Sequence, residues 1–138
     1  MGRILGLDLG TRTIGIAISD NLEMIASAVE TYRFREDDFD SAFSRVVEVV
    51  NEKKVYKIVL GYPKHMNGDI GDKATLCEEF GKRLKQELNI DVILLDERWT
   101  TKLAQNRLLE FDLSRNKRKK IIDKMAAVVI LQNYLDSK

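Results

Sequence analysis

The stretch RILGLDLGTRTIGIAIS, residues 3–19, decides the fold. Its first seven residues form an apolar run that predicts a strand, and the alternation of Ile with small residues over 13–19 predicts a second strand. The turn between them is short, so the two strands must pair antiparallel. A period of two places Asp8 on the same face as Ile4 and Gly6. An acid therefore lies on a strand whose other residues belong to a core.

The pattern downstream of residue 19 alternates between strands and helices. We expect a weaker strand at 24–32, a helix from Phe39 to Val50 and a strand at 57–61. A helix that Asp69 caps, with an apolar stripe from Ala74 to Leu88, should follow, and then a strand at 92–95 enclosed by Asp91 and Asp96. The last elements are a helix from Thr100 or Thr101 through Phe111 and a helix at about 117–134. The order is βββαβαβαα. Strand–helix–strand units require parallel strands, whereas the first three strands form an antiparallel meander. The prediction is an α/β protein with a mixed β-sheet and packed helices, which matches a ribonuclease H-like fold.

Length and composition indicate one folded domain over residues 1–138. The chain has 138 residues, 44% of them hydrophobic, which is enough for a single buried core. It has one cysteine, Cys77, and one histidine, His65, so a Cys-based zinc site and a multi-His cluster are excluded and oxygen ligands must hold any metal. The apolar N-terminal run is too short for a signal peptide or membrane span, so we expect a cytoplasmic protein without membrane contact.

The positive charge of the chain is concentrated in one segment. The net charge is only +1, which argues against a generally basic coat. Residues 115–124, however, contain six Lys and Arg side chains against a single acid, Asp123. A solvated helix face explains such a run equally well when it is taken alone. Its position beside Asp123 favours contact with nucleic acid.

Three acids occupy positions from which they can converge. Asp8 lies near the carboxyl end of the first strand, and the triplet Asp96-Glu97-Arg98 follows the apolar strand at 92–95. Ligands of open sheets bind outside the carboxyl ends of parallel strands, so these acids share one edge if their strands run parallel. Asp123 shares a helix face with Ala126, Ala127 and Ile130, which points it toward the sheet. The alternatives are a turn cap at Asp8, an exposed charge cluster at 96–98, and a rotated last helix that leaves Asp123 on the surface.

Converging carboxylates indicate a site for a hard cation. Mg²⁺ and Mn²⁺ prefer oxygen ligands, and Mg²⁺ commonly binds one or two carboxylates together with phosphate oxygens of a substrate. Hydrolysis of a phosphodiester is the reaction that such a site serves, because the metal orients the attacking water and stabilises the leaving oxygen. The basic segment and Arg98 would contact phosphates.

Four motifs in this order resemble those of a known family. They are Gly6-x-Asp8-x-Gly10 with Arg12, Gly15 and Ser19-Asp20, then Gly61-x-Pro63, then Asp96-Glu97-Arg98-x-Thr100-Thr101, and finally Asp123-x-x-Ala126-Ala127 with Ile130-Leu131-Gln132. Together they are similar to the YqgF family, also called RuvX or Holliday junction resolvase-like. That family has a ribonuclease H-like fold and is assigned to maturation of the 5′ end of 16S ribosomal RNA. The resemblance covers essentially the whole chain.

The resemblance also implies roles for individual residues. Asp8, Glu97 and Asp123 would be the catalytic acids that bind Mg²⁺ or Mn²⁺. The residues that would face the nucleic acid are Arg12, Arg98, Arg118, Lys119 and Lys120. The substrate would be pre-16S ribosomal RNA or branched DNA, with the ribosomal particle as a further partner, and the protein would be a monomer or a homodimer.

Two departures from the family pattern affect the site. Tyr62 stands where the family more often has Leu, and an aromatic ring can fill the same pocket or stack on a base. Related resolvases often place two acids one turn apart on the last helix, whereas this chain has only Asp123 there. Asp20 or Asp96 could supply the missing ligand, or Lys120 or Lys124 could replace one cation.

Other classes of protein share some of these features. The Asp8-x-Gly10-Thr11 turn also resembles the phosphate-binding loop of sugar kinases and actin-like ATPases, but those enzymes close two domains around a nucleotide. A triad hydrolase needs a nucleophile beside His65, and no motif surrounds that residue. The stronger alternative is a non-catalytic nucleic-acid-binding adaptor on the same fold. The presence of all three acids, Asp8, Glu97 and Asp123, favours an enzyme over an adaptor.

Overall fold

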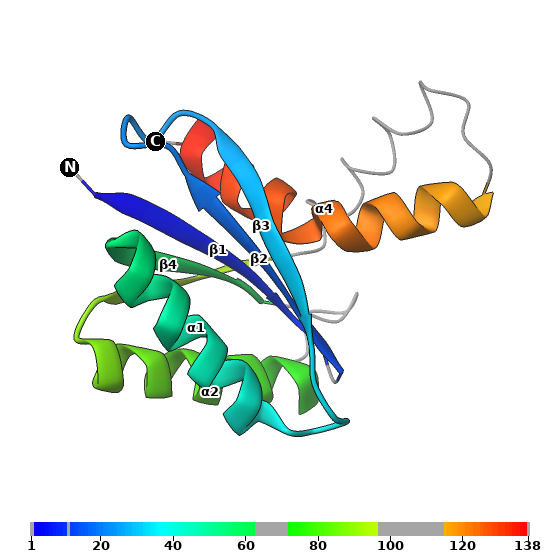
Figure 1. Ribbon diagram of the computed structural model, residues 1–138, viewed down its shortest axis with the longest axis horizontal. Coiled ribbons are helices and arrows are strands. Elements are labelled where there is room, and N and C mark those ends of the chain that lie inside the picture. The colour runs from blue at the N-terminus through cyan, green and yellow to red at the C-terminus, as the bar shows by residue number, and fades with distance from the viewer. Residues whose placement is uncertain (1, 11, 63–71, 97–114, 138) are drawn as a thin grey trace.

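Five strands and three described helices form the protein in the computed structural model (Figure 1). The structure describes residues 2–10, 12–62, 72–96 and 115–137, and the side chains of residues 62, 72–74, 96 and 115–124 lie outside that description. The strands are β1 (Arg3–Leu9), β2 (Thr13–Ser19), β3 (Ala26–Arg33), β4 (Val55–Tyr62) and β5 (Asp91–Asp96), and the helices are α1 (Phe39–Lys53), α2 (Asp72–Leu88) and α4 (Arg115–Asp136).

The observed elements follow the sequence prediction closely. β1 and β2 have the predicted bounds, β5 includes Asp91 and Asp96 in addition to the predicted residues 92–95, and β4 and α4 also extend beyond the prediction at both ends. β3 starts at Ala26 rather than at residue 24, because the backbone N–H groups of Met24 and Ile25 donate to the Asp20 side chain and so belong to the preceding turn. The predicted Asp69 cap and the helix that starts at Thr100 or Thr101 fall outside the described residues.

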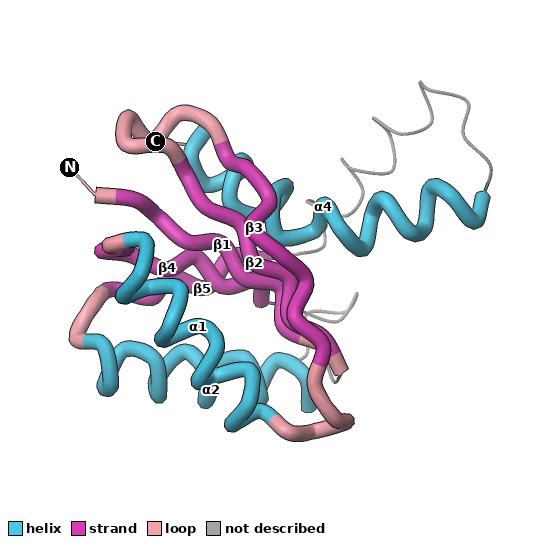
Figure 2. The backbone as a smooth tube through the Cα atoms, viewed as in Figure 1, coloured by secondary structure: helices cyan, strands magenta, loops and turns pink. Residues whose placement is uncertain are grey.

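The sheet is mixed, as predicted. Its order is β3-β2-β1-β4-β5. β1 pairs antiparallel with β2, and β2 with β3, whereas β1–β4 and β4–β5 are parallel. α1 and α2 cover one face of this sheet and α4 covers the other (Figure 2). β1 is therefore the central strand and is enclosed on both sides.

The period of two on β1 divides its side chains between two cores. Leu5, Leu7 and Leu9 are buried in the core beneath α1 and α2. Ile4 is buried on the other face, in a smaller core that it shares with Ala127 and Leu131 of α4. No helix among the described residues is long and apolar enough to cross a membrane.

Candidate active site

Asp8 lies at the edge of the sheet where the parallel strands end. In the strand register Leu7 is level with Leu60 of β4, and Tyr62 at the end of β4 is level with Asp96 of β5. The carboxyl ends of β1, β4 and β5 therefore share one edge, which confirms the prediction for Asp8 and Asp96. Glu97 and Arg98 lie outside the described residues.

The Asp8 carboxylate is half-buried and has no partner among the described residues. Its partner across the β1–β2 hairpin is Gly15. A Cβ added at Gly15 would lie 3.7 Å from the Asp8 Cβ and 3.4 Å from the Ala127 Cβ, so the missing side chain leaves space between the acid and α4. Partial burial of an unpaired carboxylate is unfavourable unless a cation or donors compensate it. A cation bound here would supply that compensation.

α4 packs on the sheet at unusually short distance. A Cβ added at Gly6 would lie 2.6 Å from the Leu131 Cβ and 3.0 Å from the Ala127 backbone oxygen. The helix backbone itself therefore touches the strand, which only glycine allows. Ala127 is fully buried in this contact, whereas Ala126 is half-buried. The prediction that the alanine pair brings the last helix close to the sheet is confirmed at Ala127.

The path of α4 over the sheet places Asp123 at the Asp8 edge. Near the C-terminus of α4, the Gln132 side chain accepts a hydrogen bond of 2.9 Å from the Ala26 backbone N–H, at the end of the sheet remote from Asp8. Five residues earlier in the chain Ala127 lies over Gly6 and Gly15. Asp123 is four residues before Ala127, so the next turn of the same helix face reaches the level of Asp8. The Asp123 side chain lies outside the description, so its role as a ligand stays a prediction.

Arg12 belongs to the same edge. It stands in the turn between β1 and β2, where its backbone oxygen accepts from Phe34. Its guanidinium lies 3.3 Å from the Glu36 carboxylate, with both side chains largely exposed. An exposed ion pair contributes little to stability, so a phosphate can replace Glu36 at low cost. The position is consistent with the predicted contact to nucleic acid.

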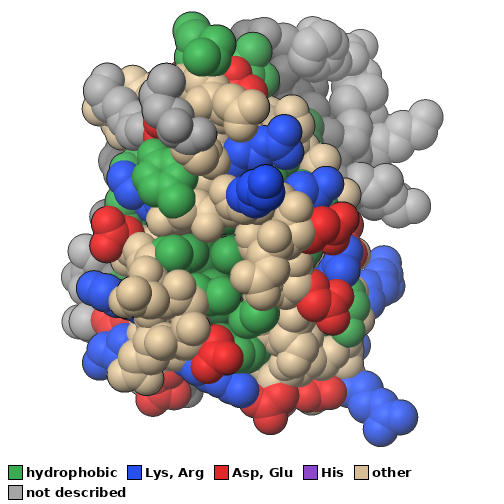
Figure 3. Space-filling view, turned by 60° about the vertical axis from the view of Figure 1, so that its left-hand side comes forward, with side chains coloured by type: hydrophobic (Ala, Val, Ile, Leu, Met, Phe, Trp, Pro, Cys, Tyr) green, Lys and Arg blue, Asp and Glu red, His purple; other side chains and the backbone are tan. Residues whose placement is uncertain are grey.

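The basic segment forms the first turns of α4. The amino-terminal half of this helix extends beyond the sheet, on the side to which β1 runs (Figure 1). Arg118, Lys119 and Lys120 lie in that half, and their side chains are outside the description. The face seen in Figure 3, by contrast, carries acidic and basic side chains side by side.

Asp20 lies at the wrong end of the molecule to serve as a further ligand. β2 runs antiparallel to β1, so the residue after Ser19 is at the start of β1, where Leu5 pairs with Ile18, and not at its Asp8 end. The Asp20 carboxylate accepts from Met24 at 2.8 Å and from Ile25 at 3.1 Å. Ser19 is buried and accepts from the Ile4 N–H. The Ser19-Asp20 motif is thus structural, which corrects the suggestion that Asp20 completes the site.

Replacing Asp20 with Asn is expected to change the pH dependence of stability and leave the candidate site intact. Hydrogen bonds from the Ile25 and then the Met24 backbone N–H lower the pKa of the Asp20 carboxyl. A lowered pKa in the folded state gives stability that is present above the ordinary carboxyl pKa and is lost as pH falls through the folded pKa. Thermal unfolding from about pH 6 to about pH 3 should therefore show an acid-dependent loss in the parent that is smaller in Asp20→Asn. An identical loss in both proteins would contradict this role.

The glycines near Asp8 have different surroundings. Glycines at positions 6 and 10 predict close approach of a ligand or of backbone beside the acid, and the α4 backbone does approach Gly6 closely. In the structure α4 fills the space above Gly6, and the gap beside the acid is at Gly15. The position of Gly15 beside the acid could have been found from the hairpin, because a short connection between the first two strands pairs Asp8 with Gly15. In the described part of the chain no three His, Cys, Asp or Glu residues lie close enough to bind one metal ion.

The sheet topology and the site define a class of protein, and the sequence match then assigns the family. The mixed sheet, with an unpartnered aspartate at the end of its central strand, is that of a ribonuclease H-like α/β protein. The sequence matches RuvX, described as Holliday junction resolvase, over residues 2–137, so this chain belongs to the RuvX family. The resemblance stated from the four motifs is confirmed.

Similar proteins support this placement. A protein of Bacillus thuringiensis (strain Al Hakam) named "Putative pre-16S rRNA nuclease" is 49% identical over 136 residues, which cover 99% of each chain. T. thermophilus RuvC in complex with a Holliday junction substrate matches with a TM-score of 0.62 at 12% identity, over 99% of this chain and 95% of RuvC. The Fowlpox virus Holliday junction resolvase matches with a TM-score of 0.56 at 16% identity, over 99% of both chains. The two solved structures confirm the predicted fold.

Proposed function

We propose that this protein is a divalent-metal-dependent nuclease that hydrolyses phosphodiester bonds in the maturation of the 5′ end of pre-16S ribosomal RNA. The observation that carries the proposal is the half-buried, unpartnered Asp8 at the edge where β1, β4 and β5 end. Family membership and the name of the 49% identical relative support the reaction and the substrate. The cytoplasm and the ribosomal particle follow from that substrate.

The residues at this edge fit Mg²⁺ or Mn²⁺. The candidate ligands Asp8, Glu97 and Asp123 offer only oxygen atoms, which these cations prefer. The gap at Gly15 leaves space beside Asp8 that a larger side chain would fill. When bound, such a cation activates water and neutralises charge on the phosphate. Asp96 stands level with Tyr62 at the same edge and is the remaining candidate for a fourth ligand, since Asp20 is remote.

The protein's own groups position the substrate around this site. Asp8 is fixed by the hydrogen-bonded ladder of the central strand, so its carboxylate reaches the reaction centre without rearrangement. Arg12 at the adjacent turn, Arg98 after β5, and Arg118, Lys119 and Lys120 on the projecting half of α4 bind phosphates on either side of the scissile bond. Phosphate contacts of this kind fix the register of the nucleic acid without reading its sequence.

A Holliday junction resolvase is the second candidate function. The family description and the titles of both solved neighbours refer to Holliday junctions. Such an enzyme cuts paired strands symmetrically and would act as a homodimer, whereas trimming of an RNA end needs only a monomer. Oligomeric state in the presence of each substrate therefore separates the two functions. A non-catalytic adaptor would bind these substrates and cleave none of them.

A cleavage assay with three substrates tests the proposal. Purified protein is incubated with a pre-16S ribosomal RNA fragment, a four-way DNA junction and an unrelated single-stranded RNA, each with Mg²⁺, Mn²⁺ or chelator. We expect metal-dependent cleavage of the precursor fragment in preference to the other two. Preferred cleavage of the junction would establish the resolvase instead. Binding without cleavage under all conditions, also when precursor ribosomal particles are supplied, would identify an adaptor.

A further inference from the structure

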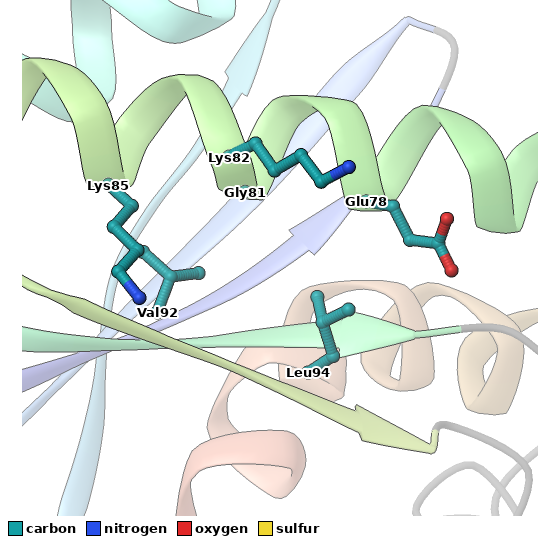
Figure 4. Close-up of a pocket in the computed structure, with 6 residues that line it drawn as sticks. All are labelled: Glu78, Gly81, Lys82, Lys85, Val92 and Leu94. Carbon is teal, nitrogen blue, oxygen red and sulfur yellow. The ribbon is translucent and has the colours of Figure 1, made fainter.

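A groove lies between α2 and the open edge of the sheet, outside the site described above (Figure 4). It has a volume of about 440 Å³. Its lining comes from two elements, with Glu78, Gly81, Lys82 and Lys85 on α2 and Val92 and Leu94 on β5. β5 is the last strand of the described sheet, so the groove borders an edge rather than the sheet interior.

The two lysines of the groove are available for a ligand. Lys82 and Lys85 are both exposed, and neither pairs with a carboxylate among the described residues. The neighbouring Arg83 differs, because its guanidinium lies 2.5 Å from the Asp40 carboxylate and 4.0 Å from the centre of the Phe43 ring. Arg83 therefore joins α2 to α1, while the lysines on either side of it serve no such contact. Lys82 and Lys85 are three residues apart, so they lie on one helix face.

The floor of the groove is apolar and partly open to solvent. Leu94 is 40% exposed, an unusual value for a leucine on a strand, and Val92 is half-buried. Gly81 provides the closest approach of α2 to β5, since a Cβ there would lie 3.4 Å from Val92 and 3.7 Å from Leu94. An apolar surface next to two ammonium groups suits a ligand that has both apolar parts and negative charge.

The direction of β5 connects the groove with the candidate active site. β5 runs from Asp91 to Asp96, and Asp96 is level with Tyr62 at the edge where Asp8 lies. A chain laid along this groove therefore passes from Lys85 and Val92 toward Leu94 and on to the catalytic edge. The groove lies on the α2 face of the sheet and Asp8 on the α4 face, so a chain that leaves the groove at Leu94 passes round the edge at Asp96 to reach the candidate site.

We propose that this groove binds a single-stranded segment of the nucleic acid substrate that continues round the edge of the sheet from the candidate active site. Backbone phosphates contact Lys82 and Lys85, and unpaired bases pack on Val92 and Leu94. A duplex keeps its bases stacked inside, so it gains nothing from the apolar floor and is not held in the groove, whereas a single strand uses both the floor and the lysines. The inference rests on the proposed function only in taking nucleic acid as the substrate. Glu78 also lines the groove, and its negative charge opposes phosphate binding. Removing that charge should therefore strengthen binding.

Equilibrium binding measurements test the groove independently of cleavage. All variants are made in Asp8→Asn protein and measured with chelator, so that cleavage does not enter. The probes are a fluorescent RNA duplex with a single-stranded extension of eight nucleotides and the same duplex with blunt ends. The test variant is Lys82→Ala with Lys85→Ala. The matched control is Lys53→Ala with Lys54→Gly at the end of α1, which removes the same charge and suits the left-handed backbone of residue 54 (φ 56°).

We expect the test variant to bind the extended duplex roughly 5- to 10-fold more weakly, with a salt slope lower by about 1.4 because two single-strand phosphate contacts are lost. Blunt duplex binding should change less than about twofold, and so should binding of either probe to the control. Leu94→Ser should weaken binding of the extension without changing the salt slope. Glu78→Gln should strengthen it.

Three results would overturn the groove assignment. The first is an equal loss of affinity for both probes, and the second is an equal effect of test and control variants. The third is a Leu94→Ser protein that binds both probes normally but changes its oligomeric state in sedimentation, which would make the groove a contact between copies of this chain. Intact selectivity for the extension in a protein that cleaves no substrate would refute the proposed nuclease and leave the groove assignment standing.

Discussion

Replacing Asp8 with Asn is expected to reduce cleavage by roughly a thousandfold or more and to leave the fold unchanged. Asn has the same shape, and the Asp8 carboxylate has no described hydrogen bond that the change would remove. The negative charge of Asp8 helps to hold a bound cation, and such a cation stabilises the transition state by several kcal/mol. At about 1.4 kcal/mol per tenfold in rate, that loss corresponds to roughly 10³-fold. Single-turnover cleavage of the preferred substrate measures it.

Metal binding at Asp8 can also be measured without cleavage, from the thermal stability of the protein. Mn²⁺ should raise the midpoint of thermal unfolding of the parent protein, since a ligand that binds only the folded state stabilises it. The rise should be absent or much smaller in Asp8→Asn. Asp20→Asn is the matched control, because it makes the same chemical change at the opposite end of β1. Equal Mn²⁺ stabilisation of the parent and of Asp8→Asn would remove Asp8 from the metal site.

Local patterns were sufficient to predict most of the fold. The alternation in residues 3–19 determines the first hairpin, and the apolar run at 92–95 gives the position of β5 to within one residue at each end. The parallel arrangement of β1, β4 and β5 then follows from connection lengths alone, and with it the shared edge at Asp8 and Asp96. These inferences succeed because each depends on residues close together in the chain or on a general rule of chain topology.

Contacts between distant segments were not predictable in the same way. Asp20 is an acid beside a strand, and the sequence does not reveal that its oxygens are already used by Met24 and Ile25. The close approach predicted at Gly6 is confirmed, but the sequence does not reveal that α4 is what approaches, because Ala127 and Leu131 are far away in the chain. The groove beside β5 went unnoticed because Lys82 and Lys85 look like an ordinary solvated helix face until Leu94 is found exposed beneath them.

A methyl group at Gly6 is expected to destabilise the protein and to weaken metal binding at the same time. The added Cβ of Gly6→Ala would lie 2.6 Å from the Leu131 Cβ and 3.0 Å from the Ala127 backbone oxygen, so α4 must move away from β1. Overpacking of this kind costs about 1–3 kcal/mol. That cost exceeds the gain of about 0.5–1 kcal/mol from replacing glycine inside a strand. Urea unfolding should show a net loss of stability.

Gly81→Ala is the control for Gly6→Ala. Mn²⁺ binding then distinguishes a displacement of α4 from a general loss of core packing. A Cβ at Gly81 would make only ordinary contacts, the shortest of 3.4 Å to Val92, so Gly81→Ala should gain about 0.8–1 kcal/mol as a helix-interior replacement. α4 carries Asp123 toward Asp8, so Gly6→Ala should also require more Mn²⁺ for half of its thermal stabilisation, whereas Gly81→Ala should not. Unchanged stability and Mn²⁺ dependence in Gly6→Ala would mean that α4 does not rest on β1 at this distance, and the placement of Asp123 beside Asp8 would lose its support.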